Sequence, residues 1–77
     1  MSKTPHELSE EFPGKAEAIH ALRESDAHFR RLADEYQSVN EAIHRAETRV
    51  DAIDDAEETR MRKHRMMLKD QIAARLA

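Results

Sequence analysis

Residues 15–50 contain no proline or glycine, and from Phe29 onward their apolar side chains recur at alternating steps of three and four. The first set of positions, seven residues apart, holds Leu22, Phe29, Tyr36, Ile43 and Val50. The second set, three residues further along each repeat, holds Ser25, Leu32, Val39, Ala46 and Ile53. Such heptads are typical of a coiled-coil helix. The pattern predicts one long amphipathic helix over residues 15–50 and an all-α protein.

A short helix is predicted ahead of the long one. Thr4 is a good N-cap, Pro5 suits the first helical position, and a glutamate follows at the capping-box position. We expect this helix over residues 5–11. The Phe-Pro-Gly sequence at residues 12–14 ends it, because proline disfavours helical geometry in the residue before it. Residues 1–14 therefore form a capped N-terminal helix and a break.

A second long helix is predicted over residues 55–75, after an acidic turn at residues 51–54. Asp54 is a suitable N-cap, and Glu57 stands at the capping-box position. A short turn between two helices indicates an antiparallel hairpin, here with unequal arms over residues 15–77. The longer arm would extend beyond the shorter one by about 20 Å.

The chain has 77 residues and no cysteine, so its core is small and no disulfide can reinforce it. We therefore expect a homo-oligomer, most simply a dimeric four-helix bundle. Its seam would be formed by the apolar stripe of the two arms: Leu22, Phe29, Leu32, Tyr36, Val39, Ile43, Leu68 and Ile72. Met66 and Met67 are adjacent and cannot both face this seam, and we interpret them as a second contact surface.

Charge is divided unequally along the chain. Residues 1–58 carry 7 basic and 15 acidic side chains, a net charge of −8, whereas residues 59–77 carry 6 and 1, a net charge of +5. The basic run contains Arg60, Arg62, Lys63 and Arg65. These side chains could contact nucleic-acid phosphates or an acidic protein partner. The alternative, which we favour, is charge pairing with the acidic first arm.

Candidate catalytic and metal sites are weak. Glu17 and His20 recur in the same spacing as Glu41 and His44, and Glu-x-x-His is found in di-iron bundles. The two copies lie about 36 Å apart along one predicted helix and would not meet within a chain. No glycine-rich phosphate loop or paired nucleophile and base is present. We expect no catalytic residue, no metal and no cofactor.

Several short sequence pieces, in this order, resemble a known family. They are His6-Glu7-Leu8, Glu11-Phe12-Pro13, Ile19-His20-Ala21-Leu22, His28-Phe29, Leu32-Ala33-Asp34-Glu35-Tyr36, Ile43-His44-Arg45-Ala46-Glu47, Lys63-His64-Arg65 and Leu68-Lys69-Asp70-Gln71-Ile72. The chain resembles the YdcH-like family of small bacterial proteins of unknown function. The resemblance implies a small α-helical protein and supplies no activity.

The function that these features favour is a non-enzymatic helical interaction or adaptor protein. The alternative is a nucleic-acid-associated protein that uses the basic second helix. No apolar run follows the first seven residues and none is long enough to cross a membrane, so we expect a cytoplasmic protein.

Overall fold

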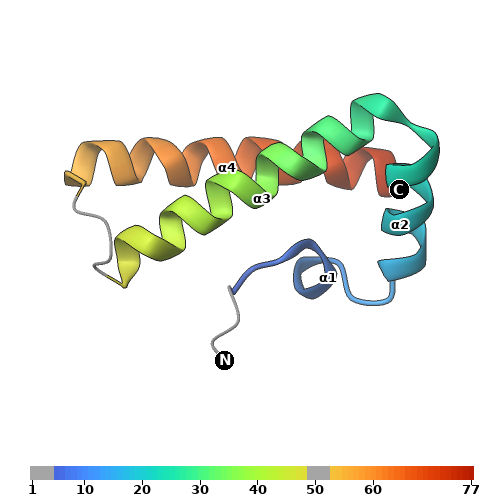
Figure 1. Ribbon diagram of the computed structural model, residues 1–77, viewed down its shortest axis with the longest axis horizontal. Coiled ribbons are helices and arrows are strands. Elements are labelled where there is room, and N and C mark those ends of the chain that lie inside the picture. Colours follow the sequence, from blue (N-terminus) through green and yellow to red (C-terminus); the bar gives the residue numbers. More distant parts are fainter. Residues whose placement is uncertain (1–4, 49–52) are drawn as a thin grey trace.

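The computed structural model describes residues 5–48 and 53–77 (Figure 1). Its elements are α1 (Leu8–Glu11), α2 (Ala16–Ser25), α3 (Ala27–Glu47) and α4 (Asp55–Leu76). No strand occurs among the described residues, which confirms the all-α prediction. The predicted cap Thr4, the stripe residue Val50 and the first half of the acidic turn lie outside the described residues.

The first helix begins later than predicted. It starts at Leu8, and its N-cap is Glu7 rather than Thr4. The Glu7 backbone N–H donates to the Glu10 carboxylate at 3.3 Å, so the capping box lies three residues further along the chain. His6 explains the delay, because its φ of 62° lies in the left-handed region and cannot continue a right-handed helix.

The prediction of one helix over residues 15–50 is wrong, because the chain bends at Asp26. This residue is extended, with φ −133° and ψ 107°. Its carboxylate accepts hydrogen bonds from the backbone N–H groups of His28 at 3.0 Å and Phe29 at 3.2 Å, which makes it the N-cap of α3. The same carboxylate pairs with Arg75 near the end of α4.

The bend removes the predicted overhang of the first arm. In Figure 1, α2 turns across the end of the α3–α4 pair, beside the C-terminus, instead of extending away from it. Ile19 is thereby buried and Leu22 is half-buried against the core. A straight helix would have left both side chains in water, so burial of apolar surface favours the bend.

The antiparallel hairpin of α3 and α4 is as predicted. The two helices lie side by side over most of their length, and α4 starts near the end of α3 (Figure 1). Asp54 is the N-cap of α4, and its carboxylate accepts from the Glu57 N–H at 2.7 Å. The local capping signals therefore placed the start of this helix correctly.

The apolar stripe is used inside the single chain. The core cluster contains Ile19, Phe29, Leu32, Ala33, Tyr36, Leu68 and Ile72. Ile43 is also buried, and Leu22 and Val39 are partly buried against this cluster. Six of the eight residues assigned to an oligomer seam are therefore buried by the chain's own helices. A second copy can reach them only if these helices separate.

Candidate binding site

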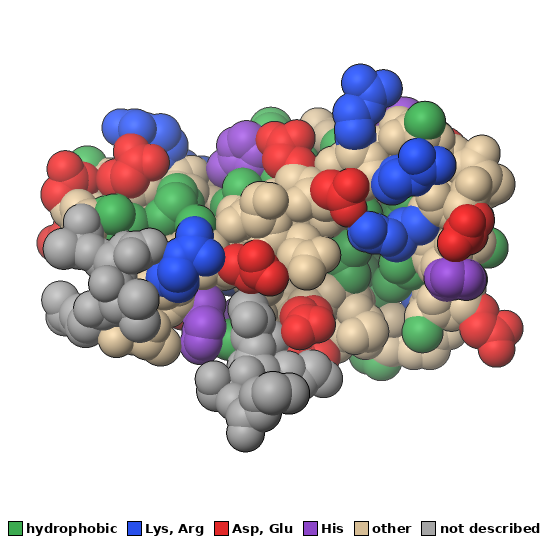
Figure 2. All heavy atoms as spheres, viewed as in Figure 1, with side chains coloured by type: hydrophobic (Ala, Val, Ile, Leu, Met, Phe, Trp, Pro, Cys, Tyr) green, Lys and Arg blue, Asp and Glu red, His purple; other side chains and the backbone are tan. Residues whose placement is uncertain are grey.

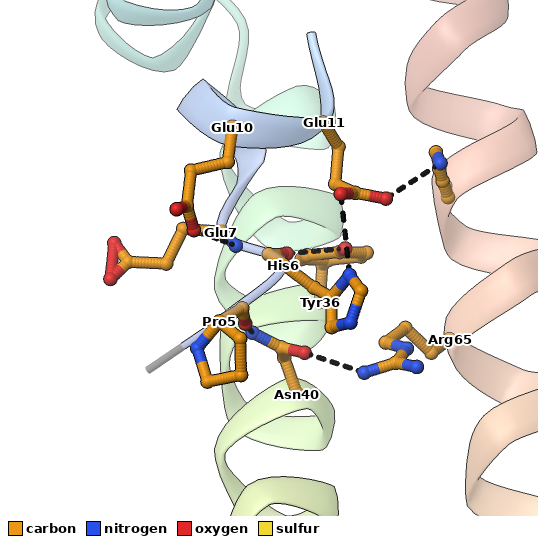
Figure 3. A network of polar contacts seen from close by, with 9 residues as sticks. Pro5, His6, Glu7, Glu10, Glu11, Tyr36, Asn40 and Arg65 are labelled. Carbon is orange, nitrogen blue, oxygen red and sulfur yellow. Dashed lines mark hydrogen bonds and ion pairs between the residues drawn. The ribbon is translucent and has the colours of Figure 1, made fainter. Parts of the chain in front are cut away.

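The N-terminal segment, defined here as residues 5–11, is held on α3 by two buried side chains. The Tyr36 hydroxyl donates to the His6 carbonyl at 2.7 Å, and the Asn40 side-chain N–H donates to the Pro5 carbonyl at 2.7 Å (Figure 3). Tyr36 and Asn40 lie one turn apart on one face of α3, with exposures of 1% and 2%. Both acceptors are backbone carbonyls, so these contacts depend on the path of the segment rather than on its side chains.

Arg65 brings α4 into the same network. Its guanidinium donates to the Asn40 side-chain oxygen at 2.8 Å, so the Asn40 amide joins the N-terminal segment, α3 and α4 (Figure 3). Asn40 is the one amide or charged side chain among the described residues that is fully buried. Among the described residues, no carboxylate lies at ion-pair distance from the half-buried Arg65. The hydrogen bond that its guanidinium makes there is to a neutral amide.

Glu11 supplies the one carboxylate of this site. It accepts from the Lys69 ammonium at 2.7 Å and lies 3.3 Å from the His6 ring. The Lys69 hydrogen bond holds the pKa of Glu11 below its ordinary value, against desolvation, which raises it, and with a smaller lowering by His6. Burial raises the pKa of Tyr36, the charge of Glu11 raises it further, and Arg65 opposes this. At neutral pH, Glu11 is therefore ionised and Tyr36 is not.

These side chains border a pocket of about 320 Å³ between the N-terminal segment and α4. It is lined by His6, Glu11, Tyr36, Arg62, Arg65, Met66 and Lys69. Three cations of α4 face one carboxylate, and a methionine and an aromatic ring provide apolar wall. A pocket of this size and lining suits an anionic group attached to an apolar one.

The predicted basic residues separate into two groups. Arg62 and Arg65 line the pocket, whereas the exposed Arg60 and Lys63 do not. Arg62 pairs with Glu47 of α3 at 2.8 Å, and this hydrogen bond raises the pKa of its guanidinium. Arg60 pairs with a glutamate of its own helix.

The expected charge pairing between the two arms is present. Besides Arg62, Arg75 of α4 pairs with Asp26, the N-cap of α3. The His64 ring of α4 also lies at hydrogen-bond distance, 2.7 Å, from the Glu35 carboxylate of α3. On the face shown in Figure 2, basic and acidic side chains are interspersed and no large patch of one sign is seen. Ion pairs therefore join the two arms of the hairpin.

The two Glu-x-x-His copies remain apart. Glu17 and His20 are exposed on α2, and Glu41 and His44 lie on α3. In residues 5–48 and 53–77, no three His, Cys, Asp or Glu side chains are grouped to hold a metal ion. No described helix is long and apolar enough to cross a membrane.

Sequence reasoning missed Asn40 and the role of the N-terminal segment. The sequence signal is that Ala33 and Asn40 occupy the same flanking heptad position. In the structure both side chains are buried, so the buried face of α3 is wider than a two-helix seam.

A protein-family model matches the part of the chain that forms the α3–α4 hairpin. Residues 29–76 match the sequence model of a family described as "Protein of unknown function (DUF465)". The chain belongs to this family. It is the YdcH-like family, so the resemblance is confirmed. The matched range contains Tyr36, Asn40, Arg65 and Lys69, whereas the N-terminal segment lies outside it. No curated protein and no solved structure matches the chain.

Proposed function

We propose that this member of the family is a non-enzymatic helical adaptor that binds a protein partner at the pocket between the N-terminal segment and α4. The observation that carries the proposal is the half-buried Arg65, whose positive charge has no carboxylate partner among the described residues, beside the exposed side chain of Met66. A cation of this kind can bind an anionic group through charge-assisted hydrogen bonds. The cytoplasm remains the expected compartment.

Met66 supplies the apolar part of the proposed contact. Its side chain is 66% exposed and lines the pocket together with Arg62 and Lys69, which lie one turn to either side on α4. Methionine adapts its shape to different apolar surfaces, which suits it to partner binding. Met67 is 49% exposed and does not line the pocket.

Self-association into a dimeric four-helix bundle remains part of the proposal. The stripe residues are buried within one chain, so a dimer built on them requires α4 of one copy to pack on α3 of another. Such an exchange keeps the same apolar contacts. Sedimentation analysis at micromolar concentration tests it, and a monomer under those conditions contradicts it.

Nucleic-acid binding through the basic helix is the alternative. Its support is the exposure of Arg60 and Lys63 outside the pocket. The pairing of Arg62 with Glu47 weakens it, because a phosphate would have to replace that carboxylate. A salt-sensitive gel shift with mixed RNA or DNA would support this alternative.

The test of the adaptor proposal uses two variants that differ by one position. Tagged wild-type chain, Met66→Gln and Met67→Gln are used to capture proteins from a lysate of the source cells treated with nuclease. We expect one partner to be retained by wild type and by Met67→Gln and to be lost with Met66→Gln. Equal capture by all three chains, or no stoichiometric partner, contradicts the proposal. Circular dichroism checks that each variant is folded.

A further inference from the structure

The N-terminal segment contacts α3 and α4 through two backbone carbonyls and one carboxylate, as a bound peptide would. We propose that it is a built-in ligand, and that an acidic segment of a partner protein that follows the same bent path takes its place on Tyr36, Asn40, Arg65 and Lys69. We call these four residues the docking site. This inference rests on the proposed adaptor function and specifies the chemistry of the partner.

The first part of the recognition is independent of sequence. Two successive backbone carbonyls, those of Pro5 and His6, accept hydrogen bonds from Asn40 and Tyr36 at 2.7 Å each. Every peptide carries such carbonyls, so another chain that follows the same bent path offers the same two acceptors. The buried donors are fixed by the packing of α3 and need no rearrangement.

The second part of the recognition selects an acidic residue. Lys69 holds the Glu11 carboxylate at 2.7 Å, and Arg65 adds a positive charge that, among the described residues, is bonded to a neutral amide. A competing segment therefore needs a carboxylate about as far along its chain as Glu11 lies from His6. Leu8 packs partly buried against the core between these points, so an apolar side chain is favoured there.

The path of the segment turns at His6, whose φ of 62° lies in the left-handed region. Histidine is among the few residues besides glycine that are enriched in this region. A partner segment therefore needs a residue that tolerates this conformation, such as glycine, asparagine, aspartate or histidine, at the corresponding position. Gly14, with a φ of 80°, lies in the connection to α2 and permits the turn there.

The family match separates the two components. Tyr36, Asn40, Arg65 and Lys69 all lie within residues 29–76, and the built-in ligand lies before them. The four docking-site residues thus lie within the matched range, and the segment that occupies the site precedes it.

The probe for this inference is a fluorescent peptide with the sequence of residues 5–12. Its affinity is measured by anisotropy for the full-length chain and for the full-length Glu11→Gln variant, which loosens the chain's own segment. We expect the variant to bind the peptide about fivefold more tightly, as the loss of a partly exposed ion pair predicts. Glu10→Gln is the matched control and should bind as wild type does, because Glu10 does not contact Lys69.

Location and charge preference are tested separately. Location is tested by adding Tyr36→Phe to the Glu11→Gln chain, because this removes the hydroxyl that donates to the His6 carbonyl, and we expect weaker peptide binding. In the Glu11→Gln chain, we expect weaker binding of a second peptide in which glutamine replaces the residue corresponding to Glu11. Adding Lys69→Gln to that chain should abolish the difference between the two peptides.

Equal affinity of wild type and Glu11→Gln for the peptide, an unchanged affinity after Tyr36→Phe, or no binding at millimolar peptide overturns the inference. These results are distinct from failure of the adaptor proposal. A partner that is lost with Met66→Gln, together with no peptide binding, leaves the adaptor function standing and removes the built-in ligand. Peptide binding with no captured partner supports the docking site and contradicts the adaptor function.

Discussion

Asn40→Ala is the perturbation that tests the network most directly. The substitution removes the amide that joins the N-terminal segment, α3 and α4 through its contacts with Pro5 and Arg65. Alanine forms helices well, so α3 itself should remain intact. Any loss of stability therefore reports the network and not the helix.

The magnitude follows from the two hydrogen bonds. The neutral bond to the Pro5 carbonyl contributes about 1 kcal/mol, and the bond from the charged Arg65 contributes about 1.5–3 kcal/mol. The higher helix propensity of alanine offsets about 0.5 kcal/mol of this loss in the free energy of unfolding. We expect the free energy of unfolding to fall by about 2–3.5 kcal/mol. This is a large part of the roughly 4–12 kcal/mol typical of a chain of this size.

The assay is urea denaturation followed by circular dichroism, with thermal unfolding as a second measure. The melting temperature should fall by roughly 4–8 °C for each kcal/mol lost. Gln37→Ala is the matched control, because it also replaces an amide of α3 with alanine, but at an exposed position whose amide donates to the Glu41 carboxylate of the same helix at 3.4 Å. We expect the control to change the free energy of unfolding by less than about 0.5 kcal/mol.

One result would refute this reasoning. If Asn40→Ala and Gln37→Ala unfold with free energies within about 0.5 kcal/mol of each other, the buried amide does not hold the segment in place. The hydrogen bonds of Asn40 that Figure 3 shows would then contribute little to the free energy of unfolding.

Three further predictions concern other parts of the molecule. Because burial and then the charge of Glu11 raise the pKa of Tyr36, the related stability is complete below the ordinary tyrosine pKa and is lost as pH rises through the folded value. Ultraviolet titration should show a lower Tyr36 pKa in Glu11→Gln, and an unchanged value contradicts the assigned cause. Asp26→Ala should reduce the free energy of unfolding by about 1–2 kcal/mol in urea, since the N-cap of α3 is lost; a neutral effect would show that the bend needs no cap. Changing Met66 and Met67 together to glutamine should leave the unfolding free energy within about 0.5 kcal/mol while reducing oligomer size in sedimentation, and an unchanged size removes the second contact surface.

The hairpin was predictable because its signals are local. The stripe of α3 depends on side chains three and four residues apart, and the start of α4 depends on Asp54 and a backbone N–H three residues later. The intramolecular charge pairing followed from the opposite net charges of the two arms. The same charge division also favoured the antiparallel arrangement.

The bend at Asp26 shows where the periodicity was misleading. The capping signal was present in the sequence, because aspartate is a preferred N-cap. It competed with an unbroken heptad pattern, and the outcome depended on whether α2 could bury Ile19 against the rest of the chain. The residues around Asp26 do not show whether the N-cap or the heptad pattern dominates. The packing of α2 against the core decides it.

The sequence by itself determined the helical class, the hairpin and the family of this protein. The tertiary structure decided that the apolar stripe is buried within one chain and that the N-terminal segment lies on Tyr36 and Asn40. The physical reason is separation along the chain. Capping and periodicity act over about four residues, whereas the Tyr36 and Lys69 contacts to that segment join residues 30 and 58 positions apart. Such contacts form only after the helices have packed.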